Sequence, residues 1–161
     1  MKFNFKKTGF YLLIALAIFS GQFLINRGLI TGRPPVINPQ TISGQAAMEI
    51  IDQGPAIIYF WAEWCGVCKM MQNPVSKISQ DYPVLTVAVK SGDQNAVQKY
   101  IDENALNWKV VNDPLGKLAE KYQVRGVPSL FFLNKTGEIG LTASGYTSEF
   151  GLRIRMWLVN N

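Results

Sequence analysis

A run of apolar residues, two cysteines and a helical pattern follow one another between Ala56 and Val75, and this segment constrains the fold most. Its first six residues, AIIYFW, are apolar and rich in isoleucine and aromatic residues, which predicts a buried strand. After Cys65 the apolar residues recur at helical intervals, which predicts a helix that buries one stripe. That stripe consists of Val67, Met70, Met71, Val75 and Ile78. Cys65 and Cys68 then lie one turn apart on the same face, where their sulfurs can close a short disulfide.

The position of Cys65 at a helix start favours thiol chemistry. Free backbone N–H groups and the positive end of the helix dipole stabilise an anion there, so this thiol should ionise more readily than that of a free cysteine. A thiolate is the nucleophile that disulfide exchange requires. Cys68 lies deeper along the helix and suits the role of resolving a mixed disulfide.

Two other uses of the cysteine pair stay open. One is a fixed structural disulfide, and the other is part of a metal site. Zinc takes three or four protein ligands, and the chain has no histidine and no third cysteine. Two thiolates one turn apart meet the soft-ligand preference of Cu(I), so a copper-binding or copper-delivery module is the alternative function.

The segment WAEWCGVCK resembles the active site of the thioredoxin superfamily, and VRGVPSLFFL downstream resembles the segment with that family's cis-proline, here Pro128. The extra helix and strand between the two motifs are similar to the membrane-tethered TlpA-like branch, and within it to the suppressor-for-copper-sensitivity D type. The resemblance covers roughly residues 42 to 158. It implies an α/β thioredoxin-like fold with a mixed central sheet flanked by helices.

The resemblance also implies the site of a protein thiol-disulfide oxidoreductase that needs no cofactor and no metal. Cys65 and Cys68 would be the catalytic pair. The residues implied in substrate binding are Trp64, Gly66, Val67, Val127 and Pro128. In the family, the residue before the cis-proline pairs with a substrate strand through its backbone. The proline lacks the N–H that could disturb the thiolate or capture a metal.

Some positions depart from the thioredoxin pattern. Thioredoxins keep a buried aspartate six residues before the first cysteine, and this chain has Tyr59 there. A carboxylate that assists proton transfer is missing at this place, unless Glu63 or another residue substitutes for it. Trp61 is expected to pack in the core, and Trp64 is expected to lie at the rim of the site. Pro74, one residue later than in thioredoxins, predicts a kink in the first helix.

The N-terminal region predicts a membrane anchor over residues 1–27. Thr8–Asn26 is nineteen residues long and uncharged, which is enough to cross a bilayer. Three lysines precede this run and Arg27 follows it, which favours a cytoplasmic N-terminus. The prediction is a single-pass inner-membrane protein whose catalytic domain faces the periplasm or the cell exterior. A cleaved signal peptide with a site at Ala15–Ala17 is the alternative.

Residues 28–41 contain Gly-Arg-Pro-Pro and Asn-Pro and predict a semi-rigid linker, so the domain should occupy residues 42–161. Further strands are predicted at Val84–Val89, Val110–Val111, Ser129–Leu133 and Ile139–Ala143, the last two forming a hairpin around Asn134–Gly137. Helices should be capped by Ser43, Asp93, Asp113 and Thr147. The faces expected to pack inward are Ala46, Ala47, Ile50 and Ile51; Val97, Tyr100, Ile101 and Ala105; Leu115, Leu118, Ala119 and Tyr122; and Phe150, Ile154, Trp157 and Leu158.

The partners follow from charge and location. The formal net charge is +5, but no cluster of basic residues with interleaved aromatics predicts nucleic-acid binding. Protein disulfide or dithiol substrates and a transmembrane electron donor are the predicted partners. The dipeptide Gly66-Val67 lacks the histidine of strongly oxidising relatives, which favours a reductive role. A role in cytochrome c maturation is a third hypothesis.

Overall fold

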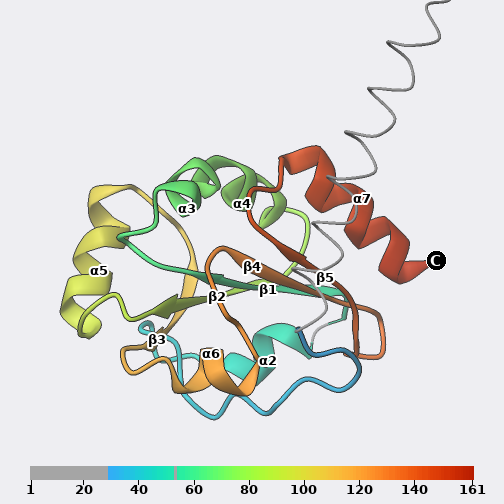
Figure 1. Ribbon diagram of the computed structural model, residues 1–161, viewed down its shortest axis with the longest axis horizontal. Helices are drawn as coiled ribbons and strands as arrows, with labels where there is room; N and C mark the ends of the chain where they lie inside the picture. The colour runs from blue at the N-terminus through green and yellow to red at the C-terminus, as the bar shows by residue number, and fades with distance from the viewer. Residues whose placement is uncertain (1–28, 53) are drawn as a thin grey trace, which may run out of the picture.

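A five-stranded mixed sheet forms the centre of the molecule in the computed structural model, which describes residues 29–52 and 54–161 (Figure 1). The strands are β1 (Ala56–Trp61), β2 (Val84–Val89), β3 (Lys109–Asp113), β4 (Ser129–Leu133) and β5 (Ile139–Ser144). They lie in the order β3-β2-β1-β4-β5, with β1, β2 and β3 parallel and with β4 antiparallel to both β1 and β5. The predicted mixed central sheet is confirmed.

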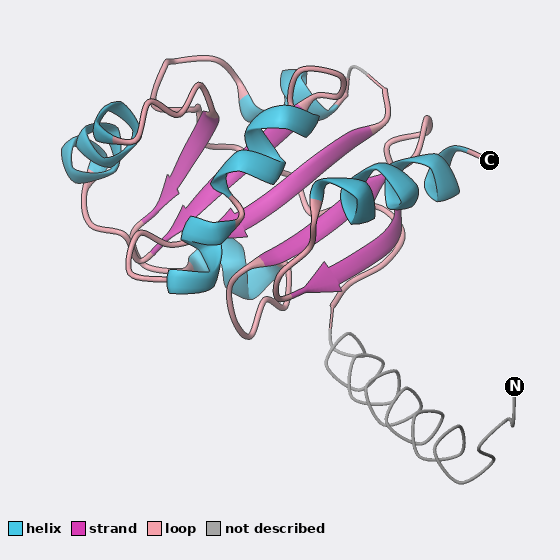
Figure 2. Ribbon diagram, turned by 90° about the horizontal axis from the view of Figure 1, so that it is seen from above, coloured by secondary structure: helices cyan, strands magenta, loops and turns pink. Residues whose placement is uncertain are grey.

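Helices cover both faces of this sheet (Figure 2). They are α2 (Ala47–Ile51), α3 (Gly66–Met70), α4 (Gln72–Ile78), α5 (Gln94–Glu103), α6 (Lys117–Lys121) and α7 (Glu149–Asn160). Residues of α3, α4, α5 and α7 share one hydrophobic cluster, whereas residues of α2 and α6 share the other. The sheet is therefore buried on both sides, as the apolar sequences of β1 and β2 predict.

Alternate residues of the central strand β1 belong to different hydrophobic clusters. Tyr59 and Trp61 point to the side of α3, α4, α5 and α7, while Ile58 and Phe60 point to the side of α2 and α6. Every residue of β1 is buried. This burial fixes the end of β1, and with it the position of the cysteines that follow.

The starts of three helices differ from the predictions. α2 is preceded by Ala46 rather than capped by Ser43, whose hydroxyl lies 3.0 Å from that of Thr41. The Asp113 carboxylate does accept a helix N–H, from Ala119 at 2.9 Å, but Asp113 ends β3 and α6 begins only at Lys117. α7 is capped by Ser148, one residue after the predicted Thr147. The N-cap residues of α2 and α6, Ala46 and Gly116, make no side-chain cap hydrogen bond, so a polar residue near a helix start did not by itself mark the cap.

The buried face of α7 is not the predicted one. Its buried side chains are Leu152 and Met156. The residues expected inside, Phe150, Ile154, Trp157 and Leu158, are all exposed. α7 has apolar residues on more than one side, so their spacing alone did not determine which side meets the sheet.

Other predicted inward residues are also exposed, for local reasons. Leu115 lies in the loop before α6, and Ala105 follows the end of α5 with a φ of 49°. Val67 and Met70 lie on α3, which ends at Met70. The stripe that α4 buries is confirmed at Val75 and Ile78, and Met71 between the two helices is buried with them.

The kink predicted from Pro74 appears as a break between α3 and α4 at Met71. Pro74 has no N–H to donate to the carbonyl of Met70. The Met71 N–H instead donates to the Cys68 carbonyl oxygen at 3.0 Å, which tightens the last turn of α3. The short helix α3 carries the cysteines, and α4 carries most of the buried apolar residues.

Residues 29–41 pack onto the domain, in contrast to the extended linker predicted there. Gly32 forms an antiparallel bridge with Ile139, the first residue of β5. Ile37 is 1% exposed, and the Tyr122 hydroxyl donates to the Pro35 carbonyl oxygen at 2.9 Å. The predicted anchor over residues 1–27 lies outside the described residues. None of the helices described in 29–161 has the length and apolar character needed to cross a bilayer.

Candidate active site

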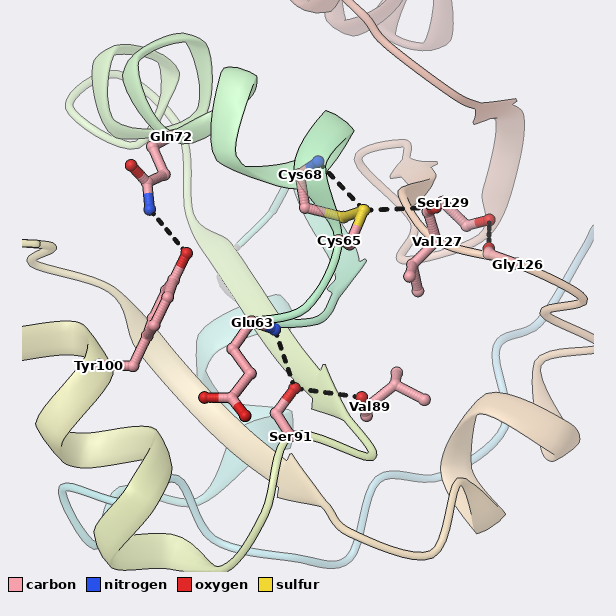
Figure 3. Close-up of a disulfide and its surroundings, with 10 residues drawn as sticks. All are labelled: Glu63, Cys65, Cys68, Gln72, Val89, Ser91, Tyr100, Gly126, Val127 and Ser129. Atoms are coloured by element: carbon pink, nitrogen blue, oxygen red, sulfur yellow. Dashed lines mark hydrogen bonds between the residues drawn. A yellow bond between two sulfur atoms is a disulfide. The ribbon is translucent and has the colours of Figure 1, made fainter.

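Cys65 and Cys68 form a disulfide at the carboxyl end of β1, with their Cα atoms 5.2 Å apart. Cys65 is the cap residue of α3, and its Sγ accepts the backbone N–H of Cys68 at 3.1 Å (Figure 3). Cys65 is 7% exposed and Cys68 is 3% exposed. The geometry therefore agrees with the predicted disulfide at a helix start, with Cys65 slightly more exposed than Cys68.

The loop before β4 lies opposite the sulfurs. The Val127 carbonyl oxygen is 3.6 Å from Cys65 Sγ, and the Val127–Pro128 peptide bond is cis. Ser129 holds this loop by donating its hydroxyl to the Gly126 carbonyl oxygen at 2.8 Å (Figure 3). The structure thus brings the two sequence motifs, about sixty residues apart, to within contact distance.

The segment before the cysteines is tied to the end of β2. The Glu63 N–H donates to Ser91 Oγ at 3.1 Å, and the Ser91 hydroxyl donates to the Val89 carbonyl oxygen at 3.1 Å (Figure 3). The exposed Trp64 donates its indole N–H to the Lys90 carbonyl oxygen at 3.1 Å. Sequence reasoning missed Lys90 and Ser91, and the only signal for them was their place directly after a parallel strand.

The remaining predicted substrate residues surround the disulfide. Gly66 and Val67 are exposed on the first turn of α3, and Pro128 is buried beneath the facing loop. A cavity of about 380 Å³ lies alongside, between Trp64 and Val127. Its wall includes Lys90, Leu115, Gly116 and Arg125. Trp64, Gly66 and Val67 thus adjoin the cysteines along the chain, and Val127 meets Cys65 from the facing loop, with the buried Pro128 next to it.

Aromatic side chains fill the space behind the site. Trp61 is buried and packs against Tyr100 and Trp108, with ring centroids 5.3 and 5.4 Å apart. The Tyr59 hydroxyl is buried and has no hydrogen-bond partner among the described residues. Burial, and secondarily Tyr100, raises the pKa of Tyr59 well above its ordinary value. A phenol in this state stays neutral and does not replace the missing carboxylate as a proton acceptor.

Glu63, the other sequence candidate for that role, turns its carboxylate away from the disulfide (Figure 3). Tyr100 has a raised pKa, chiefly because it is partly desolvated, with the Glu63 charge adding to the rise and a hydrogen bond from Gln72 opposing it. The charge of Glu63 therefore contributes to the raised pKa of Tyr100. Within the described part of the chain, no three or more His, Cys, Asp or Glu side chains gather as a metal-binding group.

Comparison with known proteins agrees with this geometry. The AhpC/TSA family matches residues 37–141. A thioredoxin-like protein from Haemophilus influenzae is 30% identical over 155 residues, which cover 94% of this chain and 92% of that protein. The sporulation thiol-disulfide oxidoreductase A of Bacillus subtilis is 31% identical over 120 residues, covering 70% of this chain and 72% of that protein.

Solved structures show the same fold. The crystal structure of StoA from Bacillus subtilis matches with a TM-score of 0.63 and 26% identity, over 75% of this chain and 96% of that one. A DsbE-type thiol:disulfide interchange protein from Chlorobium tepidum matches with a TM-score of 0.70 at 20% identity, over 81% and 96% of the two chains. The family matches well over half of the sequence, and the predicted cysteine pair lies in the matched region. The chain therefore belongs to the AhpC/TSA family of thioredoxin-like proteins and is a thiol-disulfide oxidoreductase with a Cys-x-x-Cys pair.

Proposed function

We propose that this protein is anchored in the inner membrane and reduces disulfides of protein substrates outside the cytoplasm. The observation that carries the proposal is the placement of Cys65. Its Sγ accepts the Cys68 N–H at 3.1 Å and lies 3.6 Å from the Val127 carbonyl oxygen, at a surface lined by exposed residues. One sulfur is thus poised for exchange and the other lies behind it.

The exchange proceeds in two steps from the reduced pair. The Cys65 thiolate attacks one sulfur of a substrate disulfide, and the other substrate sulfur leaves as a thiolate and takes a proton. Cys68, as a thiolate, then attacks Cys65 and releases the second substrate sulfur. Two electrons pass to the substrate, and the protein is left with the Cys65–Cys68 disulfide seen in the structure. In this scheme the Cys68 N–H steadies negative charge on Cys65.

Substrate binding is assigned to the face around the cysteines, formed by Trp64, Gly66, Val67, Val127 and Pro128. A substrate strand that pairs with the backbone of Val127 would bring its cysteine beside Cys65, because the Val127 carbonyl lies against that sulfur. Pro128 offers no backbone N–H that could compete for the thiolate. Trp64 presents a flat exposed ring whose edge is fixed by the bond to Lys90.

The proposed role of the membrane anchor is to keep the domain close to its source of electrons. A compartment outside the cytoplasm is oxidising, so a reductant there must be reduced again after each cycle. The uncharged run Thr8–Asn26 would hold the domain beside a transmembrane dithiol donor, which is the partner we propose.

The test is partner capture with Cys68→Ser in intact membranes. The first step then still occurs, but the mixed disulfide on Cys65 has no resolving thiol, so trapped partners should appear as bands that a reductant removes. Cys65→Ser is the matched control and should trap at most a small fraction of these bands. Equal trapping by both variants would reject Cys65 as the attacking residue.

The copper alternative predicts a different result from the same variants. A copper-binding module would hold Cu(I) between the two reduced thiols and would form no mixed disulfides with proteins. If the reduced wild-type protein binds Cu(I) and Cys68→Ser traps no partner, disulfide exchange is rejected as the function and copper binding is supported.

A further inference from the structure

The outer side of α7 carries an apolar surface that disulfide exchange does not use. Phe150, Ile154, Trp157 and Leu158 are 73%, 40%, 62% and 52% exposed. Their spacing places them in one row along the helix, called here the α7 stripe. Ten large hydrophobic side chains are exposed in the described part of the chain, and four of them form this stripe. Such a concentration marks a binding surface.

We propose that the α7 stripe lies on the surface of the lipid bilayer, at the level of the headgroups and upper acyl chains. This inference depends on the membrane anchor of the proposed function and goes beyond it, since it fixes which side of the domain faces the lipid. The side of α7 opposite the stripe is apolar as well, but there Leu152 and Met156 are buried against the sheet, so only the stripe is available to lipid. Tryptophan is favoured at the level of the headgroups.

The segment between the proposed membrane span and the domain, called here the tether, is short, and this supports lipid as the partner of the α7 stripe. The Gly32 N–H donates to the Ile139 carbonyl oxygen at 3.0 Å, and the Ile139 N–H donates back to Gly32 at 2.7 Å. Only five residues, 27–31, separate this bridge from the proposed span Thr8–Asn26. Five residues reach at most about 18 Å when fully extended. The start of β5 is therefore held close to the bilayer surface.

α7 ends at the same end of the sheet as this bridge. Val159 packs against Gly140, the residue after Ile139, so closely that a methyl group added at Gly140 would lie 3.2 Å from Val159 Cγ1. Trp157 and Leu158 directly precede Val159 and share this position. Helix α7 runs along the same side of the molecule as β4 and β5 (Figure 1).

The active site lies at the opposite end of the sheet. Ile139 pairs with Leu133, which pairs with Ala56 at the start of β1, whereas Cys65 follows the end of β1. α7 follows the end of β5, which lies on the active-site side, and runs back toward the bridge, so Trp157 and Leu158 form the end of the stripe that is farther from Cys65. Protein substrates could still reach it.

The charges on α7 also fit a lipid surface. Its one carboxylate, Glu149, is paired with Lys77 at 3.3 Å and with Arg153 at 3.1 Å, so α7 itself carries no unpaired acidic side chain. Arg155 is held against the Gly151 carbonyl oxygen at 3.0 Å, and its long side chain can reach phosphate groups. A second copy of the chain is disfavoured, because a single row on a helix about 18 Å long is small beside the roughly 800 Å² per partner of a stable interface.

The experiment uses the full chain in vesicles of phosphatidylcholine and phosphatidylglycerol, with and without bromine on the acyl chains. Bromine quenches only tryptophans that reach the lipid. The difference between wild type and Trp157→Phe gives the emission of Trp157, and this part should fall about twofold or more in brominated vesicles. The emission that remains in Trp157→Phe includes Trp64 at the far end and should change little.

Substitutions on the stripe provide a second measurement. Ile154→Gln with Leu158→Gln should remove most of the bromine quenching of Trp157 while leaving the protein in the vesicle fraction. Leu115→Gln, at an exposed apolar residue on another part of the surface, is the matched control and should leave the quenching unchanged.

Each outcome separates lipid docking from the anchor. Resistance to alkaline extraction with no bromine quenching of Trp157 would keep the anchor and overturn the docking. Quenching in a protein that alkali removes would support the docking and overturn the anchor. Shielding of Trp157 from a water-soluble quencher without any effect of bromine would assign the stripe to a protein partner or a second copy, and would also overturn the proposal.

Discussion

The hydroxyl of Tyr59 lies at the place where thioredoxins keep an aspartate, and its burial without a partner leads to a stability prediction. A buried polar group without a hydrogen bond opposes folding. Tyr59→Phe should therefore leave the free energy of unfolding unchanged or raise it by about 1 kcal/mol. Urea unfolding followed by far-UV circular dichroism measures this difference. Rates of disulfide exchange should stay the same, because the raised pKa keeps the phenol neutral.

Tyr122→Phe is the matched control for Tyr59→Phe. The Tyr122 hydroxyl is also on a buried ring, but it donates to the Pro35 carbonyl oxygen at 2.9 Å. Its removal should lower the free energy of unfolding by about 1 kcal/mol. A loss of similar size in both variants would show that the Tyr59 hydroxyl has a partner after all.

The residues of the site could largely be predicted, because their chemistry is local. The spacing of Cys65 and Cys68 at a strand-to-helix junction is visible in the sequence, and Pro128 stands in a recognisable segment. Lys90 and Ser91 could not be predicted in the same way. They contribute a carbonyl oxygen and a hydroxyl to the loop before Cys65, and such contacts depend on which strands become neighbours.

At the scale of elements, α7 is held in place by ion pairs whose strength depends on pH. Glu149 contacts Lys77 of α4 and Arg153 of α7, and the hydrogen bond from Arg153, followed by Lys77, lowers the pKa of Glu149 below its ordinary 4.5. A carboxylate whose pKa is lower in the folded state stabilises the fold above its unfolded pKa. That stabilisation is lost as the pH falls through the folded pKa.

Glu149→Gln should therefore unfold at a lower urea concentration than wild type at pH 7. The gap should narrow once the pH drops below about 4.5 and should close at lower pH, because the wild-type carboxyl is then protonated. Glu103→Gln removes an exposed pair with Lys99 on α5 and serves as the control with little change at either pH. A gap that is the same at both pH values would exclude a contribution of the Glu149 charge.

The strands could be predicted more accurately than the helices. β1 and β2 match their predicted bounds, since continuous apolar runs between polar residues have clear ends. α6 buries Leu118, Ala119 and Tyr122 as predicted but begins later than predicted, whereas α7 has apolar residues on competing sides. The choice between those sides is made by packing against the sheet, which the sequence pattern does not contain.

At the scale of the whole molecule, the boundary of the domain is set by packing rather than by composition. Residues 29–41 have the proline-rich composition of a linker, yet Ile37 is buried and Gly32 pairs with β5. Proline and glycine indicate that a segment is not helical, but they do not indicate whether that segment packs against the domain. Residues 29–41 are therefore part of the folded domain rather than a linker beside it.

The direction of electron flow is the last prediction, and it depends on how the protein stabilises its reduced pair. The Cys68 N–H contacts Cys65 Sγ, but α3 is only five residues long and Gly66 and Val67 add no positive charge. A reduced form with little stabilisation makes a better reductant. Equilibration of the full chain with glutathione buffers should give a reduction potential nearer about −270 mV, as for thioredoxin, than about −120 mV, as for strong thiol oxidants.

A pair of variants on α3 tests the reason for this potential. Val67→His would place a cation beside Cys65 and should make the reduction potential less negative. Met70→His, at the exposed far end of α3, is the control and should change the potential little. A wild-type dithiol that stays reduced in an oxidising glutathione buffer would instead identify the protein as an oxidant.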